Sequence, residues 1–263
     1  MGKGKIHIGA SGWSYKHWAE AFYPEELPDK EKLQFYANHF RTVEINSTFY
    51  HLPLESTVKK WREQVPDDFI FAVKASRYIT HIKRLLDEES VKNFLGRAKL
   101  LKEKLGVILF QLPPSFKANN ERLENFIRLL PKKYRYTVEF RDDSWFTEET
   151  YEILRKRDVA ICFSDLKGKC TPLVLTASFV YVRLHGPQKA YRGLYNSKEL
   201  AEWAKRLDRW SRAGKTCFLY FDNDERGYAI KNAAELITMV TKKRSQKSEV
   251  GRLIKRKFIL RKA

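Results

Sequence analysis

The chain has 263 residues, of which 43% are hydrophobic and 14% aromatic, and its 51 lysines and arginines against 32 acidic residues give a formal net charge of +19. This composition excludes a disordered or collagen-like chain, and no apolar run approaches the ~18 residues that a membrane-spanning helix requires. Three scattered cysteines argue against a disulfide framework, and the first residues lack the apolar core of a signal peptide, so we expect a cytoplasmic protein.

Short β-rich runs alternate with longer helical patterns along most of the chain. The runs cover residues 6–10, 42–46, 70–74, 107–111, 136–140, 160–164, 179–183 and 217–221, with helical stretches such as 29–40, 90–105 and 197–213 between them. This alternation predicts parallel strands joined by crossovers, and eight such units are the number that closes a barrel. Only residues 166–178 lack a helical pattern and are predicted to form a loop. We therefore predict an α/β fold, a single (β/α)8 TIM barrel, over residues 1–240.

A basic tail follows the eight units. From Thr241 to Ala263 there are ten basic residues and one acid, Glu249. The tail is either an amphipathic helix that forms on a partner, an ordered extension of the barrel, or a solvated segment. An excess of positive charge attracts polyanions, whereas a highly charged thermophile surface usually carries nearly as much Glu as Lys. The charge therefore favours a nucleic-acid partner, with DNA preferred to RNA and no membrane partner.

Polar residues gather at the ends of the predicted strands, where the active sites of α/β barrels lie. Three pairs are two residues apart (Glu44 and Asn46, Glu139 and Arg141, Arg183 and His185), so each pair projects from one face of its strand. A purely structural barrel would not need such groups, because buried unpaired charge is costly. The candidates are Trp13, Tyr15, Glu44, Asn46, Lys74, Arg77, His81, Gln111, Glu139, Arg141, Trp145, Asp165, Arg183, His185, Tyr220, Asp222 and Asn223.

Several of these residues lie in longer motifs that follow one another along the chain: SGWSY (11–15), TVEINSTFY (42–50), FAVKA (71–75), QLPPSF (111–116), VEFR (138–141), RLHG (183–186) and YFDND (220–224). In these motifs the chain resembles the YecE-like family of TIM-barrel proteins, also called domain of unknown function 72. The resemblance covers roughly residues 6–235. It implies a TIM barrel and says little about function, and the basic tail is not part of the family pattern.

The catalytic candidates are Glu44, Lys74, Glu139, His185 and Asp222. Paired carboxylates can serve as acid and base or hold a metal, or they can simply form ion pairs with neighbouring cations. A lysine at a strand end can form a Schiff base, bind phosphate or form an ion pair. Because paired histidines and Cys-x-x-Cys motifs are absent, we assign no metal ligand and no cofactor, with an oxygen-rich Mg²⁺ or Mn²⁺ site as the alternative.

Aromatic residues beside cations suggest a ligand with both flat rings and phosphates. The predicted rim carries Trp13, Tyr15, Trp18, Tyr50, Tyr78, Trp145 and Tyr191, although a barrel also needs aromatic residues in its core. The leading hypothesis is a DNA-processing or DNA-repair enzyme of the endonuclease or glycosylase type. A flipped nucleotide would stack on Trp13 or Tyr15, with its phosphates on Arg77, Arg141 or Arg183. The alternatives are an enzyme acting on a small phosphorylated or sugar-like metabolite, and a non-catalytic nucleic-acid-binding protein. No oligomeric state is indicated.

Overall fold

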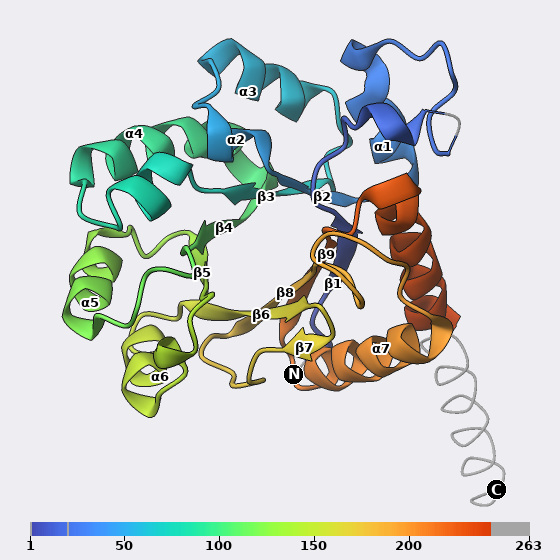
Figure 1. Ribbon diagram of the computed structural model, residues 1–263. Coiled ribbons are helices and arrows are strands. Elements are labelled where there is room, and N and C mark those ends of the chain that lie inside the picture. Colours follow the sequence, from blue (N-terminus) through green and yellow to red (C-terminus); the bar gives the residue numbers. More distant parts are fainter. Residues whose placement is uncertain (1, 20, 243–263) are drawn as a thin grey trace, which may run out of the picture.

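Parallel strands ringed by helices make up residues 2–19 and 21–242, the part of the chain that the computed structural model describes (Figure 1). The strands pair in the order β1 (Ile6–Ala10), β9 (Thr216–Phe221), β8 (Phe179–Leu184), β6 (Ala160–Leu166), β5 (Arg135–Glu139), β4 (Leu105–Gln111), β3 (Ile70–Lys74) and β2 (Thr42–Ile45). The helices are α1 (Lys32–His39), α2 (Ser47–Tyr50), α3 (Glu55–Glu63), α4 (Glu88–Ala98), α5 (Asn120–Leu129), α6 (Glu148–Arg155), α7 (Ser197–Arg212) and a last helix over residues 228–242. The predicted TIM barrel is confirmed.

The barrel closes between β1 and β2, which approach closely without a full ladder. The hydroxyl of Tyr36, from α1, accepts from the Ala10 N–H at 2.9 Å and donates to the Thr42 carbonyl at 3.0 Å. A side chain at Gly9 would place its Cβ 2.2 Å from that carbonyl, so only glycine fits. The N–H of Gly12 then donates to the carbonyl of Glu44 at 2.8 Å. This closure brings the loop after β1 to the carboxyl end of β2.

Alternation along each strand divides the core into two parts. On β8, Val180, Val182 and Leu184 pack toward the helices, whereas Phe179 and Tyr181 lie in a second apolar cluster, inside the barrel. Ala72, Val107 and Phe218, from other strands, belong to the same inner cluster. The next inward position on β8 is Arg183, so the interior changes from apolar to charged toward the carboxyl ends of the strands.

The segment predicted as a loop, residues 166–178, contains no helix. It begins with a hairpin in which β7 (Lys169–Cys170) pairs antiparallel with the end of β6. Residues Lys167 and Gly168 form the turn, both with positive φ. The hairpin forms one wall of a pocket described below.

The final described helix continues to residue 242, two residues beyond the boundary predicted between barrel and tail. Residues 243–263 of the basic tail lie outside the described residues. Within the described ranges, every helix is too short or too polar to cross a membrane.

Candidate active site

Arg183 lies at the centre of the barrel mouth with its guanidinium fully buried. It donates to Glu44 Oε1 at 2.8 Å, to Glu139 Oε2 at 2.8 Å and to Asp222 Oδ2 at 2.9 Å. These carboxylates come from β2, β5 and the residue after β9. Burial alone would lower the pKa of Arg183, but the three carboxylates outweigh it and raise the pKa well above its usual value. A guanidinium therefore occupies the centre of the carboxylate cluster, and no group of described His, Cys, Asp and Glu residues is arranged to hold a metal.

The imidazole of His185 lies between two of these carboxylates. Its Nδ1 is 2.8 Å from Asp222 Oδ2, and its Nε2 is 3.0 Å from Glu139 Oε1 and 3.0 Å from Nη2 of Arg141. The N–H of Tyr191 donates to the carbonyl of His185 at 2.5 Å, and the Tyr191 ring meets the imidazole edge-on. The ring of His185 is thus held on three sides, and its Nε2 faces both an acceptor and a donor.

Glu139 and Asp222 stay ionised although both are buried. Burial would raise the pKa of Glu139, but Arg141, at 2.5 Å, together with Arg183 and His185 holds it well below its usual range. Burial likewise opposes the ionisation of Asp222, but Arg183 and His185 lower its pKa to about 2. Both carboxylates are therefore negatively charged at neutral pH, and they can orient the imidazole and stabilise its protonated form.

Glu44 accepts hydrogen bonds from buried donors on both oxygens. Besides Arg183, Ser11 Oγ donates to its Oε1 and the Tyr181 hydroxyl to its Oε2, each at 2.6 Å. With its oxygens occupied, Glu44 orients Arg183, and it lines none of the pockets described below. Ser11 and Tyr181 were not among the predicted site residues. The two-residue spacing of Tyr181, Arg183 and His185 on β8 was the signal that could have identified the tyrosine.

Lys74 ends β3 beside this cluster, half-buried, with its Nζ 4.2 Å from the centre of the Phe49 ring. Among residues 2–19 and 21–242, no hydrogen bond or ion pair to its amine is formed. Burial, followed by the positive charge of Arg183, lowers the pKa of Lys74 to about 8. On the flanking strands, Asn46 Oδ1 and Gln111 Oε1 are buried without a hydrogen-bond partner.

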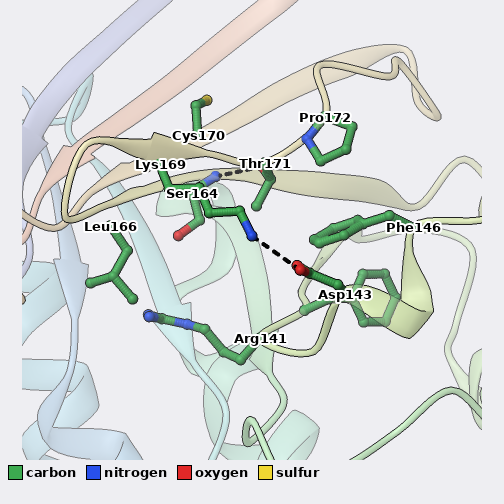
Figure 2. Close-up of a pocket in the computed structure, with 10 residues that line it drawn as sticks. Arg141, Asp143, Phe146, Ser164, Leu166, Lys169, Cys170, Thr171 and Pro172 are labelled. Atoms are coloured by element: carbon green, nitrogen blue, oxygen red, sulfur yellow. Dashed lines mark hydrogen bonds and ion pairs between the residues drawn. The ribbon is translucent and has the colours of Figure 1, made fainter.

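A pocket of about 500 Å³ opens next to the cluster, between the β6–β7 hairpin and the segment after β5 (Figure 2). Nζ of Lys169 pairs with Oδ2 of Asp143 at 3.0 Å across it. Arg141, which contacts Glu139 and His185, and Ser164, whose Oγ is 3.4 Å from Glu139 Oε1, connect the pocket to the cluster. It is lined by Phe140, Arg141, Asp143, Phe146, Ser164, Leu166, Lys169, Cys170, Thr171 and Pro172. We name it the Arg141 pocket; most of its hairpin residues were missed because residues 166–178 offered no pattern.

Arg77 lines a different pocket, of about 520 Å³, with Phe49, Tyr50 and Tyr78. Tyr50 and Tyr78 are exposed there, as predicted for the rim. His81 packs edge-on against the Phe49 ring. Burial and the nearby Lys74, Arg77 and Arg141 lower the pKa of His81 to about 4, so it is neutral at pH 7.

Three predicted rim or binding aromatics belong to the core instead. Trp145 is fully buried, donates its indole N–H to the Phe116 carbonyl at 2.7 Å and stacks on Phe140. Trp18 is also fully buried. Tyr220 lies in the inner apolar cluster, and its hydroxyl is hydrogen-bonded to Thr42 Oγ1. The polar end of a buried aromatic usually finds a protein partner, and the indole N–H of Trp18 likewise donates to the Asp224 carbonyl at 3.2 Å.

Three other predicted binding residues have protein partners near the mouth. Half-buried Trp13 meets Trp61 of α3 edge-on, and the Tyr15 hydroxyl donates to the Ser11 carbonyl at 2.5 Å. The amide of Asn223 donates to the Gly193 carbonyl, which positions the loop that carries Tyr191. Asp165 is half-buried with an unpartnered Oδ1, and burial raises its pKa.

Comparison with known proteins finds relatives both by sequence and by structure. The profile of the family described as "Protein of unknown function DUF72" matches residues 7–253. The UPF0759 protein YunF of Bacillus subtilis is 28% identical, over 89% of this chain and 94% of its own length. A crystal structure of a DUF72 family protein (TM1631) from Thermotoga maritima superposes with a TM-score of 0.81 at 32% identity, covering 90% of this chain and 99% of that one. One from Enterococcus faecalis (EF0366), at 21% identity, covers 90% and 95% with a TM-score of 0.77.

Proposed function

The chain belongs to the DUF72 family, and we propose that it is an enzyme acting on one phosphate-bearing nucleotide unit of DNA in the barrel mouth. The observation that carries the proposal is the position of His185 Nε2 between the carboxylate of Glu139 and the guanidinium of Arg141. A protonated Nε2 donates to Glu139, and a neutral Nε2 accepts from Arg141, so both protonation states have a partner. An imidazole placed in this way suits general acid–base catalysis, with Asp222 holding the ring through Nδ1.

The Arg141 pocket supports a substrate that carries both charge and a ring. Arg141 and Lys169 are its two cations, and its one acid, Asp143, is already paired with Lys169. A guanidinium binds phosphate oxygens in a bidentate manner, and the Phe146 ring offers a stacking surface. The volume of about 500 Å³ lies in the usual range for a small-molecule ligand.

Binding and proton transfer are coupled through Arg141 in this proposal. A phosphate on Arg141 competes with Glu139 for the same guanidinium, so a bound substrate would leave the Glu139 carboxylate to His185. Loss of the Arg141–Glu139 ion pair makes Glu139 and His185 together a stronger base, and this happens only when a substrate fills the pocket. Ser164 lies at the boundary between the pocket and Glu139, where a substrate hydroxyl would meet the carboxylate.

The net charge of +19 favours DNA over a free nucleotide, because phosphates flanking the bound unit add counterion release. A free phosphorylated or sugar-like metabolite is the second candidate. The pocket volume of about 500 Å³ favours this candidate, because it lies in the usual range for a small-molecule ligand. A non-catalytic nucleic-acid-binding protein would also use the positive net charge, but His185 would have no catalytic role in it.

The test is binding and turnover of a fluorescent duplex with a single damaged nucleotide, against the intact duplex and a sugar phosphate, at several salt concentrations. We expect tighter binding to the damaged duplex, and weakening of that preference in Arg141→Met. Arg128→Met, on the exposed face of α5 where Arg128 pairs with Glu124, is the matched control for charge. Equal losses in the two variants would refute the pocket assignment, and binding without turnover would refute the enzyme.

A further inference from the structure

Lys74 is half-buried, and it differs from the two buried lysines of the described chain, Lys32 and Lys104. Lys104 donates to the carbonyls of Arg62 and Val65 at 2.9 and 2.7 Å, and Lys32 pairs with Asp29 at 2.6 Å. The amine of Lys74 has neither kind of partner in the part of the chain that the structure describes, and it lies over the face of the Phe49 ring. Even partial burial of a charged group without a direct partner is costly. A lysine kept in this state at the mouth of a barrel therefore calls for a chemical explanation.

The surroundings of Lys74 favour the neutral amine. Glu44, Glu139 and Asp222 lie near enough to act on it, but each is already bound to the guanidinium of Arg183. Burial and that same guanidinium lower the pKa of Lys74 to about 8. About a tenth of the molecules then carry a neutral amine at pH 7, against less than ~0.1% for an ordinary lysine. A neutral amine has a free electron pair and is a nucleophile.

We propose that Lys74 is a catalytic nucleophile that forms an imine with an aldehyde carbon of the substrate, so that the site takes an aldehyde-bearing sugar phosphate. This inference rests on the proposed function, because the Arg141 pocket of the same mouth supplies the phosphate site. The aldehyde can belong to an abasic nucleotide in DNA or to a free sugar phosphate. Both present the same chemistry to Lys74.

The reaction balances without an oxidant or a reductant. The Nζ electron pair forms a bond to the carbonyl carbon, the C=O π electrons move to oxygen, and a proton passes from nitrogen to that oxygen. The hydroxyl then takes a second proton and leaves as water, which gives the C=N bond. The unpartnered amide oxygens of Asn46 and Gln111, on the strands flanking Lys74, are acceptors suited to the hydroxyl of this intermediate.

The experiment is reductive trapping with cyanoborohydride, in which reduction of the imine leaves a permanent secondary amine. The full-length protein is incubated with an abasic-site duplex, with glyceraldehyde 3-phosphate or with intact duplex, and the modified lysine is located by peptide mass spectrometry. We expect adducts at Lys74 with the two aldehydes and none with intact duplex. At pH 7 the adduct should form at Lys74 in preference to exposed lysines, because an ordinary lysine carries a neutral amine in less than ~0.1% of molecules.

Two variants at Lys74 and one control keep the inference falsifiable. Lys74→Met and Lys74→Arg should both lose the adduct, and the arginine variant retains the charge if the methionine variant does not fold. Lys205→Met, at an exposed lysine of α7 paired with Glu202, should trap as the unmodified sequence does. Adducts distributed over surface lysines, or an adduct yield unchanged in Lys74→Arg, would overturn the inference.

The result also separates this inference from the function it rests on. A rate at least tenfold higher with the abasic duplex identifies DNA as the source of the aldehyde, and the reverse ratio identifies a free sugar phosphate. If Lys74 is trapped while Arg141→Met binds DNA as before, the nucleophile stands and the proposed phosphate site fails. If Arg141→Met loses the damaged-site preference while neither aldehyde is trapped at Lys74, the phosphate site stands and the nucleophile is overturned.

Discussion

The barrel carries a buried lysine at one end and a half-buried lysine at the other, and the partners of the two amines differ. Lys104 comes directly before β4, at the amino end of the strands, and its amine is fixed by two backbone carbonyls. Lys74 ends β3, at the carboxyl end, and its amine is left without a hydrogen bond from any described residue. Satisfied polar groups stabilise a fold, whereas local departures from that rule concentrate at functional sites. Under the proposed function, stabilising groups lie at one end of this barrel and reacting groups at the other.

The same contrast holds for the interior between those ends. Toward the amino ends of the strands, the interior is filled by apolar side chains such as Val107, Leu109 and Phe218. Toward the carboxyl ends, the interior holds Arg183, and each of the three buried carboxylates contacts its guanidinium. Variants at the two ends should therefore separate loss of stability from loss of activity.

The largest expected effect is on activity, from Glu139→Gln. The amide keeps the shape of the side chain but carries no negative charge to stabilise protonated His185, and loss of general acid–base catalysis typically costs ~10²–10⁴-fold in rate. Turnover and thermal unfolding are to be measured on the same preparation, with the exposed Glu124→Gln as control. A folded Glu139→Gln protein with unchanged turnover would mean that Glu139 is only an ion-pair partner of Arg141 and Arg183.

The largest expected effect on stability comes from Arg183→Met. Removing this guanidinium leaves Glu44, Glu139 and Asp222 buried without their shared cation, and breaking a buried ion pair from one side costs ~3–5 kcal/mol. The cost should fall in acid, because the carboxylates can then be protonated. Urea unfolding at pH 7 and pH 4 measures both values. A loss that is equal at the two pH values would contradict the electrostatic explanation.

Lys104→Met and Lys74→Met should move stability in opposite directions. The first leaves the buried carbonyls of Arg62 and Val65 unpaired, and a lost partner of this kind costs ~1–3 kcal/mol. The second removes a half-buried charge to which no described residue makes a hydrogen bond or ion pair, so the free energy of unfolding should be unchanged or higher. Urea unfolding of both variants, with turnover measured alongside, tests this. Equal destabilisation by the two variants would remove the difference between the two ends of the barrel.

The smallest effect is a change in pH dependence at Lys74. Its pKa is about 8 in the folded protein against an ordinary value of 10.5, so between these values the unfolded chain binds more protons than the folded one. Stability contributed by this group therefore rises as the pH increases from about 8 to about 10.5. The advantage of Lys74→Met over the unmodified sequence should shrink over that interval. A pH-independent difference would show that the amine is not desolvated.

Alternation and spacing in the sequence were sufficient to predict the eight strands and which neighbours share a face. The pairs Glu139 with Arg141 and Arg183 with His185 were expected together because side chains two apart on a strand point the same way. The structure bears this out, since Arg141, Arg183 and His185 all contact Glu139. These features depend on local backbone geometry, which is repeated in every strand.

The tertiary structure alone decided which residues meet across the barrel and which are buried. Glu44, Glu139 and Asp222 are far apart in the sequence, and their convergence on Arg183 depends on how the strands close and how far each side chain reaches inward. Trp145 is of a residue type that often binds ligands, yet its hydrogen bond to the Phe116 carbonyl holds it in the core. The missing partner of Lys74 is likewise a property of the assembled mouth, because a pairing depends on three-dimensional distance and solvent access, and neither is encoded in a short stretch of chain.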